Sequence, residues 1–269
     1  MIKKPLVIGI KEPYSFRLGI INCSTHSISQ LVDEIEILLR DKSLQPRTVL
    51  CVNAHIYNLA YKNASLRKIL NNSRIVIADG MSIVWASHLF GIRIPERCNF
   101  TEAFRVFLEA SHFPNNVGIF VGMTEEEALL ATKKIEKNST HCQIIRTVSG
   151  FLNDVDYKRI FRMTKDIDFI FLGMGTPKTE RIAKIASLMC PRAIVWGIGG
   201  GTMRIYAGTM REAPVFWRRT GLQWFHRFCS APFALWRRYL FGIPLFVFRI
   251  LMESLRARGK YAHGTRKVP

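Results

Sequence analysis

Short runs of β-branched and other apolar residues alternate along the chain with longer amphipathic segments. The short runs predict buried strands, and the longer segments predict helices. The predicted strands are Thr48–Val52, Arg74–Ala78, Val117–Val121, Gln143–Val148, Asp168–Gly173 and Ala193–Gly197. The predicted helices lie near residues 55–71, 100–112, 124–137, 155–164 and 178–189. This alternation predicts an α/β fold with a Rossmann-like, mostly parallel sheet.

The pattern changes after about residue 210, where strand signals stop and the residues become basic and aromatic. We therefore predict an α/β core over residues 1–210 and a helical appendage over residues 211–269. The appendage holds twelve Lys or Arg residues against two Glu residues, so it carries +10 of the net charge of +19. Its apolar stretch Tyr239–Met252 has only 14 residues and includes Arg249, which is too short and interrupted to span a bilayer core of about 30 Å.

A helix that lies in the membrane interface fits the appendage better. Aromatic residues would enter the headgroup region while arginines meet anionic lipid. The aromatic set is Trp236, Tyr239, Phe241, Phe246 and Phe248, and the basic set is Arg237, Arg238, Arg249, Arg256 and Arg258. Periodicity alone also allows an amphipathic helix that packs on the core or on another subunit, which leaves a homo-oligomer open.

The composition narrows the partners and the compartment. A net charge of +19 implies a polyanionic partner such as phosphate groups, nucleic acid or an anionic bilayer. Six scattered cysteines without a C-x-x-C pair suggest neither disulfides nor a cysteine-rich zinc site, so we expect a reduced, cytosolic compartment. The apolar run near the N-terminus is cut by Lys11 and Glu12 and is too short for a signal peptide.

Ligands of parallel α/β sheets bind at the carboxyl ends of the strands, so polar residues directly after a strand are candidates for chemistry. Asp79 follows one predicted strand and precedes a helix. Spacing alone favours a helix cap, whereas a catalytic role requires the carboxylate to take a proton from an attacking hydroxyl. Asn53 follows another strand, where capping and binding of sugar hydroxyls are equally consistent with its position. His55 is more typical of a surface histidine and is left out of the catalytic set.

Two glycine-containing turns follow later strands. The first runs from Gly173 through Gly175 to Lys178, where a helix start and a positive charge favour phosphate. The second contains Gly199, Gly200 and Gly201, which would let the backbone approach a diphosphate closely. Such loops are more often plain turns, and neither is a Walker motif or a first-unit dinucleotide fingerprint.

Taken together, the ordered motifs resemble the WecG/TagA/CpsF glycosyltransferases, glycosyltransferase family 26. The resemblance covers about residues 18–239. Its motifs are Asn53, Ala78-Asp79-Gly80, Pro95-Glu96-Arg97, Gly173-Met-Gly175-Thr-Pro177-Lys178, Gly199-Gly-Gly-Thr202, Ala207-Gly208, Arg211-Glu-Ala-Pro214 and Gly221-Leu-Gln-Trp224-Phe-His-Arg227.

The resemblance implies an inverting transferase that needs no metal or other cofactor. It would use a UDP-sugar donor and an undecaprenyl-diphosphate-linked sugar acceptor to build a bacterial surface polysaccharide, as a peripheral protein on the cytoplasmic face of the plasma membrane. Asp79 falls on the family's proposed base, Asn53 on a residue lining the site, and Arg97 on a substrate-binding arginine. Arg227 and Arg237 fall on family arginines thought to close over the site and meet diphosphate, a task suited to the guanidinium fork.

The sequence departs from the family at several positions. Cys51 replaces the usual Thr, Thr179 a Gln, Arg204 an Asp, Gln223 a Glu, and Ala234 an Arg. Thr179 and Arg204 argue against the usual amino-sugar donor, so we expect glucose or another neutral hexose, with an N-acetylmannosamine-type donor or its uronate as the alternative. The predicted substrate-binding set is Cys51, Asn53, Arg97, Gly175, Lys178, Thr179, Gly199, Gly200, Arg227 and Arg237, with no metal ligand.

Two rival functions come from other classes. The net charge and the Arg/aromatic tail are also typical of a nucleic-acid-binding module. A Rossmann oxidoreductase would rest only on the glycine loops and lacks the early G-x-G-x-x-G followed by an acidic residue. Neither rival accounts for the internal motifs and the tail together, so we expect no nucleic-acid partner.

Overall fold

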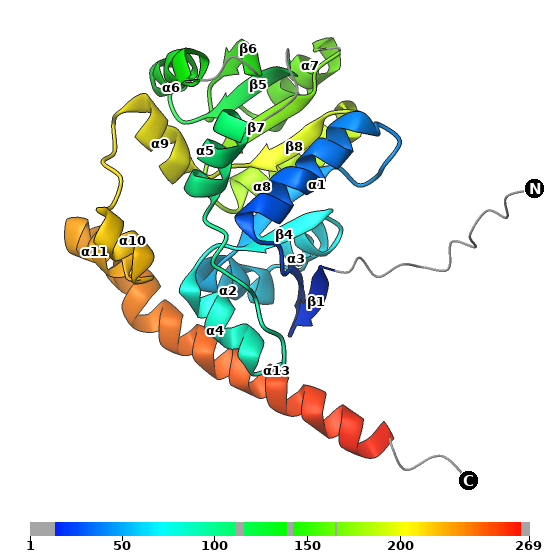
Figure 1. Cartoon of the computed structure of the whole chain (residues 1–269), viewed down its shortest axis with the longest axis vertical. Helices are drawn as coiled ribbons and strands as arrows, with labels where there is room; N and C mark the ends of the chain where they lie inside the picture. Colours follow the sequence, from blue (N-terminus) through cyan, green and yellow to red (C-terminus); the bar gives the residue numbers. More distant parts are fainter. Residues whose placement is uncertain (1–13, 111–115, 139–141, 165, 265–269) are drawn as a thin grey trace, which may run out of the picture.

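The computed structural model describes residues 14–110, 116–138, 142–164 and 166–264 (Figure 1). Residues 1–13, with the apolar run at the N-terminus, lie outside this part of the chain, as do Arg266 and Lys267. The described residues form one eight-stranded sheet. Its strands are β1 (Ser15–Leu18), β2 (Ile21–Ser24), β3 (Thr48–Val52), β4 (Ile75–Ala78), β5 (Asn116–Gly122), β6 (Cys142–Val148), β7 (Phe169–Gly173) and β8 (Ile194–Gly197).

The strands are ordered β1-β2-β4-β3-β8-β7-β5-β6, and every neighbouring pair except β1–β2 is parallel. The chain leaves β3 toward one edge of the sheet to form β4, and it approaches β8 from the other edge through β7. A crevice therefore opens at the carboxyl ends of β3 and β8, where the strand order reverses, and such crevices are where α/β sheets bind ligands. The predicted α/β fold with a mostly parallel sheet is confirmed.

Helices cover both faces of the sheet and bury two apolar clusters against it. One layer contains α1 (Ile28–Arg40), α5 (Phe100–Ala110), α6 (Glu125–Asn138) and α9 (Gly200–Ala207). The other contains α2 (Ala54–Lys62), α3 (Ala64–Asn71), α4 (Met81–His88), α7 (Asp154–Met163) and α8 (Lys178–Met189). The strands β7 and β8 are wholly buried between the layers, as their continuous apolar runs require.

The local structure refines several predicted elements. The helix expected over residues 55–71 is two helices, because Asn63 ends α2 and its side chain then accepts a hydrogen bond from Leu66 N to start α3. The β1–β2 hairpin turns at Gly19, whose φ of +55° favours glycine. The helices α1 and α9 were not among the predicted elements, while α4 is the helix predicted to follow Asp79.

The chain after α9 continues as short helices and one long helix. These are α10 (Val215–Arg219), α11 (Gln223–Ser230), α12 (Pro232–Trp236), a π-helical turn η1 (Arg237–Phe241) and α13 (Gly242–Gly264). In Figure 1, α13 runs along the lower edge of the core, next to α2 and α4. No helix within the described residues is long and apolar enough to cross a membrane.

Two predicted lipid contacts in α13 are wrong. Phe246 is buried and packs edge-on against Tyr57 of α2, with ring centres 5.3 Å apart. Arg249 is also buried, and its Nη1 donates to the backbone oxygen (3.1 Å) and to Oδ1 (2.8 Å) of Asn58. One face of α13 therefore belongs to the core, because apolar residues spaced three or four apart fall on one side of a helix.

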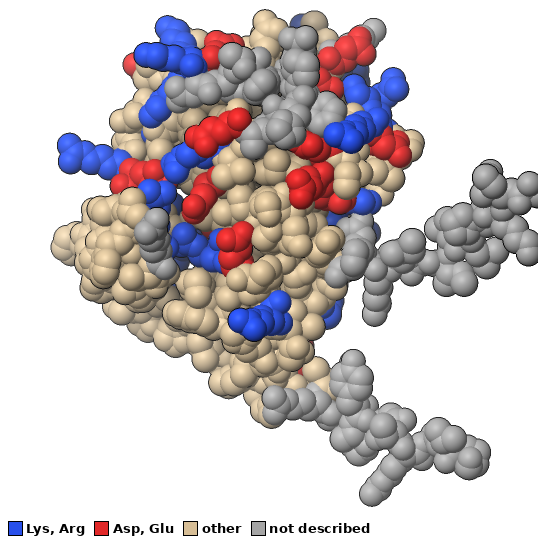
Figure 2. Space-filling view, viewed as in Figure 1, with Lys and Arg blue, Asp and Glu red and all other residues tan. Residues whose placement is uncertain are grey.

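The opposite face of the appendage exposes many apolar side chains. Its exposed members include Phe216, Phe233, Leu240, Phe241, Leu245, Phe248, Leu251 and Leu255. On the face shown in Figure 2, the surface over α10, α11 and α13 is almost free of charged side chains, which gather over the sheet and its helices instead. Arg256 pairs with Glu253 at 2.8 Å, and the side chain of Arg258 lies outside the described residues.

Candidate functional site

Asp79 follows β4 directly and projects from the carboxyl edge of the sheet. The next residue, Gly80, has φ of +138°, a conformation open mainly to glycine, so the chain turns sharply before α4 begins. Gly80 is the N-cap of α4 and no side chain caps this helix. The cap interpretation of Asp79 is therefore wrong. Among the described residues, the Asp79 carboxylate has no hydrogen-bonding or ion-pair partner, which leaves it available to a substrate hydroxyl.

Asn53 follows β3, the neighbour of β4 in the sheet. Its Oδ1 accepts a hydrogen bond from Ile56 N at 3.0 Å and caps α2, so the capping interpretation is correct. This hydrogen bond fixes the Asn53 side chain, and its Nδ2 group can still donate to a ligand. Cys51 lies two residues earlier in β3, where burial, together with the carboxylates of Asp79 and Glu180, raises the pKa of its thiol well above the ordinary value. Cys51 is therefore a neutral, polarisable wall of the site.

The two glycine turns lie on the other side of the crevice, after β7 and β8. Gly175 and Gly199 have φ of +85° and +82°, so these turns require glycine. Gly199 is the N-cap of α9, and no side chain caps that helix. The first N–H groups of α9 lack intrahelical acceptors, as at any helix start, and they offer an uncapped anion site.

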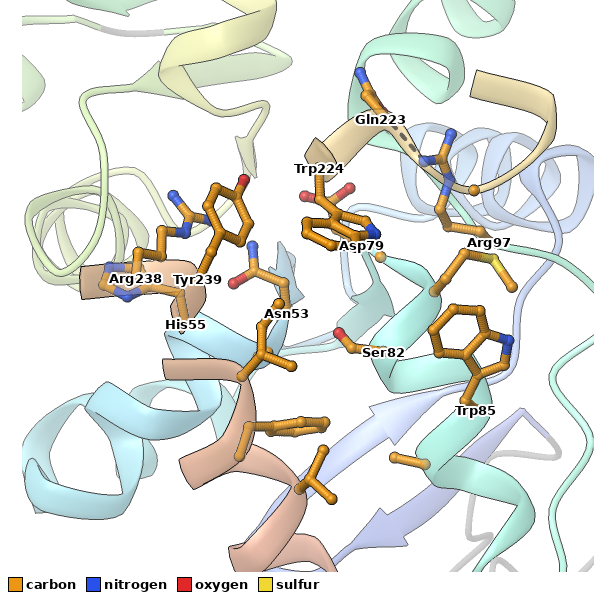
Figure 3. A pocket seen from close by; sticks show the side chains of 18 of the residues that line it. Asn53, His55, Asp79, Ser82, Trp85, Arg97, Gln223, Trp224, Arg238 and Tyr239 are labelled. Atoms are coloured by element: carbon orange, nitrogen blue, oxygen red, sulfur yellow. Dashed lines mark hydrogen bonds between the residues drawn. The ribbon is translucent and has the colours of Figure 1, made fainter. Parts of the chain in front are cut away.

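The structure forms two cavities that meet at Asp79. The first, which we name the glycine-loop cavity, encloses about 480 Å³ between the ends of β3, β7 and β8 and the start of α9. The second, which we name the apolar cavity, encloses about 470 Å³ between α4, α11 and α13 (Figure 3). The residues that line both are Asn53, His55, Asp79, Asn99, Arg227 and Arg238. Asp79 is the one carboxylate among these shared residues.

Arginines from the appendage and the core surround this junction. Arg227 of α11 lies over the start of α9, since a Cβ on Gly201 would be 3.3 Å from its Nη2. Arg97 donates from Nη1 to Oε1 of Gln223 at 3.1 Å (Figure 3), and Asn99 donates to the same oxygen at 3.0 Å. Gln223 is buried, so these hydrogen bonds hold α11 against the core. Because Gln223 is neutral, it leaves the charge of Arg97 uncompensated at the apolar cavity.

Most of the predicted site residues meet at the two cavities. The glycine-loop cavity is lined by Cys51, Gly175, Thr179, Gly199 and Gly200, and the apolar cavity by Arg97, while Asn53, Asp79 and Arg227 line both.

Lys178 and Arg237 do not line either cavity within the described part of the chain. Lys178 donates from Nζ to the backbone oxygen of Leu152 at 3.0 Å and lies over the ring of Tyr157. Arg237 is exposed and lies over the ring of Trp236. These two side chains therefore have other contacts, and their expected binding of phosphate stays a prediction.

Several residues line the site without having been predicted as site residues, among them Arg238, His55 and Glu180. Arg238 takes the place expected of Arg237, and no signal in the sequence distinguishes these adjacent arginines. His55 lies beside it, and burial followed by the charge of Arg238 lowers the pKa of this imidazole, so it is neutral at pH 7. Glu180 lines the glycine-loop cavity, and its burial raises the pKa of its carboxyl against a 2.8 Å hydrogen bond from Thr176. His55 follows β3 and Glu180 follows the first glycine turn. These positions in the sequence could have identified both residues as candidates for the site.

Within the described residues, no group of three or more His, Cys, Asp or Glu side chains is placed to hold a metal ion. The positive charge at the junction comes instead from arginines and from the start of α9. This arrangement can hold a diphosphate on one side of Asp79 and a hydroxyl-bearing molecule on the other.

Comparison with known proteins identifies the family. The sequence model of the Glycosyl transferase WecG/TagA/CpsF family matches residues 17–260. The chain is also similar to proteins from Staphylococcus aureus named N-acetylglucosaminyldiphosphoundecaprenol N-acetyl-beta-D-mannosaminyltransferase. Those of strains MW2 and NCTC 8325 / PS 47 are 24% identical over 225 residues, which is 82% of this chain and 86% of the relative. That of strain MRSA252 is 24% identical over 224 residues. The chain thus belongs to the WecG/TagA/CpsF glycosyl transferase family and is a glycosyltransferase.

Proposed function

We propose that the chain transfers a hexose, with inversion, from a UDP-sugar to a sugar carried on a polyprenyl diphosphate. The observation that carries this proposal is the position of Asp79 at the junction of two unlike cavities, one built of glycine turns and one built largely of apolar side chains. The names of the relatives support an acceptor that is a lipid-linked diphosphate sugar.

The donor binds in the glycine-loop cavity. Its diphosphate lies at the uncapped start of α9, where backbone N–H groups and the guanidinium of Arg227 converge. As the bond between the sugar and the diphosphate breaks, negative charge grows on the leaving UDP. Fixed positive groups directed at that position stabilise the transition state more than the bound substrate.

The acceptor hydroxyl approaches from the apolar cavity. Asp79 takes the hydroxyl proton while the oxygen attacks the anomeric carbon on the face opposite the UDP, so one C–O bond forms as another breaks. Asp79 becomes a carboxylic acid, and UDP leaves as the anion. A single displacement inverts the anomeric centre, so an α-linked UDP-sugar gives a β-linked product. The β-mannosaminyl product in the relatives' names is consistent with this outcome.

The sugar of the donor is the finer part of the proposal. The sequence favoured glucose because of Thr179 and Arg204, and both residues line the glycine-loop cavity. The relatives' names instead favour N-acetylmannosamine, the alternative weighed from the sequence. We therefore propose N-acetylmannosamine as the first donor to test and glucose as the second.

The experiment supplies purified enzyme with radiolabelled UDP-N-acetylmannosamine or UDP-glucose and a prenyl-diphosphate-linked N-acetylglucosamine, followed by chromatography of the lipid fraction. We expect a lipid-linked disaccharide with a β linkage. If neither donor gives labelled lipid, the proposed donor assignment is wrong. A product with an α linkage would overturn the single displacement.

We further propose that the appendage docks on the cytoplasmic face of the plasma membrane through its exposed apolar face. Phe233, Phe248 and Phe241 are 94%, 62% and 65% exposed, and burial of such side chains is worth about 1.5–3 kcal/mol each. Vesicle flotation of the double variant Phe233→Ser and Phe248→Ser tests this proposal, and we expect most of the binding to be lost. The matched control is Phe151→Ser, because Phe151 is 72% exposed and precedes α7, a helix that lies away from α13 in Figure 1. Equal loss in both variants would contradict the proposed docking face.

A further inference from the structure

The apolar cavity continues away from Asp79 as a groove between two helices. Met81, Trp85 and Ala86 of α4 form one wall together with its C-cap residue, Leu89. These positions are spaced four, one and three residues apart, so they fall on one face of the helix. Ile243, Phe246, Val247 and Ile250 of α13 form the facing wall, again from one helix face. Figure 3 shows Trp85 and the α13 side chains on opposite sides of the space.

Contacts of α13 with α2 and with the end of α4 hold the two walls in place. Phe246 packs against Tyr57, and Arg249 is held by Asn58, so α13 is anchored on α2. At the far end, Ser254 Oγ donates to the backbone oxygen of Leu89 at 3.1 Å and joins the two helices. The space between them is therefore bounded by anchored elements at both ends of the groove.

The two ends of the groove differ in character. The end at Asp79 carries Asn53, Arg97, Arg227 and Arg238, which suit hydroxyl and diphosphate groups. Toward the surface the lining becomes wholly apolar, and Trp85 and Val247 are 57% and 47% exposed at its open side. A ligand that fills the whole cavity must have an anionic, hydroxylated head and an apolar chain.

We infer that the groove between α4 and α13 binds the first isoprene units of the acceptor's polyprenyl chain, outside the bilayer. This inference rests on the proposed function and adds a site for a part of the acceptor that takes no part in the chemistry. Binding the chain there would hold the diphosphate at the arginines and the acceptor hydroxyl at Asp79. Positioning of this kind raises the rate because the reacting groups meet in a fixed geometry.

If the groove binds the prenyl chain, the KM for the acceptor should depend on the length of that chain. Transfer of the chain from a bilayer into the groove exchanges one apolar environment for another, so the effect must be measured with water-soluble acceptors in the absence of membranes. From water, each buried methylene is worth about a fourfold gain in affinity. The KM for the acceptor should therefore fall by at least about tenfold from a methyl diphosphate sugar to its farnesyl counterpart.

Two variants fill the groove from opposite walls, Ala86→Phe from α4 and Val247→Trp from α13. Both should reduce the ratio of the methyl to the farnesyl KM to near one. Leu129→Trp is the matched control, because Leu129 lies on α6, has an exposure of 46% close to the 47% of Val247, and lines neither cavity. We expect this control to keep the wild-type ratio. Unfolding curves that match those of the wild-type protein will verify the fold of each variant.

The possible results test chain binding in the groove separately from the proposed function. Transfer to both acceptors with equal KM values in the wild-type protein would overturn the groove and leave the proposed function standing. A length dependence that survives in both groove variants would also overturn it. Failure to transfer to any prenyl-diphosphate-linked sugar would overturn both.

Discussion

Asn58 joins the core to the long helix of the appendage. Its Nδ2 donates to the backbone oxygen of Gly242 at 2.6 Å, and its Oδ1 accepts from Nη1 of the buried Arg249 at 2.8 Å. The variant Asn58→Ala removes both hydrogen bonds and leaves the Arg249 charge buried with fewer acceptors. A hydrogen bond to a charged group contributes about 1.5–3 kcal/mol and a neutral one about 0.5–1.5 kcal/mol. We therefore expect the free energy of unfolding to fall by about 3 kcal/mol.

Urea-induced unfolding followed by tryptophan fluorescence measures this change, since the chain has five tryptophans. The same loss corresponds to a decrease in Tm of roughly 6–12 °C for a protein of this size. Asn72→Ala is the control, because Asn72 is exposed at the end of α3, and it should change the stability by less than about 0.5 kcal/mol. A loss below about 1 kcal/mol in Asn58→Ala would show that Asn58 and Arg249 do not anchor α13.

Two further predictions concern the glycine-loop cavity and the thiols. Gly199→Ala and Gly208→Ala place a Cβ in open space at φ of +82° and +78°, so each should lower the stability by about 1 kcal/mol. Only Gly199 lines the cavity, so calorimetric titration should show at least about a tenfold loss of UDP affinity in Gly199→Ala and none in Gly208→Ala, and equal affinities would contradict the diphosphate site. All six cysteines are free and only Cys229 is exposed, while burial raises the pKa of the thiols of Cys51, Cys98 and Cys142 and disfavours the reactive thiolate. A thiol reagent at pH 7.5 should therefore modify one cysteine rapidly in the native protein and six in guanidinium, and a second rapid thiol would show that the crevice is more open than described.

Most of the sheet could be predicted because its central strands are continuous apolar runs. β7 is buried along its whole length, and its pattern differs clearly from that of the amphipathic helices beside it. The β1–β2 hairpin was missed because its four-residue strands mix buried and exposed positions, whereas the equally short β4 and β8 are continuous buried apolar runs. Short segments of mixed character give too few positions for a period to be read.

The direction of side chains in the appendage could not be predicted from the sequence. Helix and apolar character follow from composition, but the direction of each side chain depends on what the helix packs against. Arg249 and Phe246 looked like membrane residues until α13 was seen against α2. In the same way, Arg238 rather than Arg237 lines the cavities, although the two residues are adjacent in the sequence.

We propose that Asp79 removes the proton of the acceptor hydroxyl. The most direct measurement is the turnover of Asp79→Asn in the transfer assay, with UDP affinity and unfolding measured on the same preparation. We expect a loss of turnover of roughly 100-fold or more, the usual contribution of a general base, with UDP affinity and stability close to those of the wild-type protein. Turnover within about threefold of the wild-type value in a folded, UDP-binding variant would contradict it.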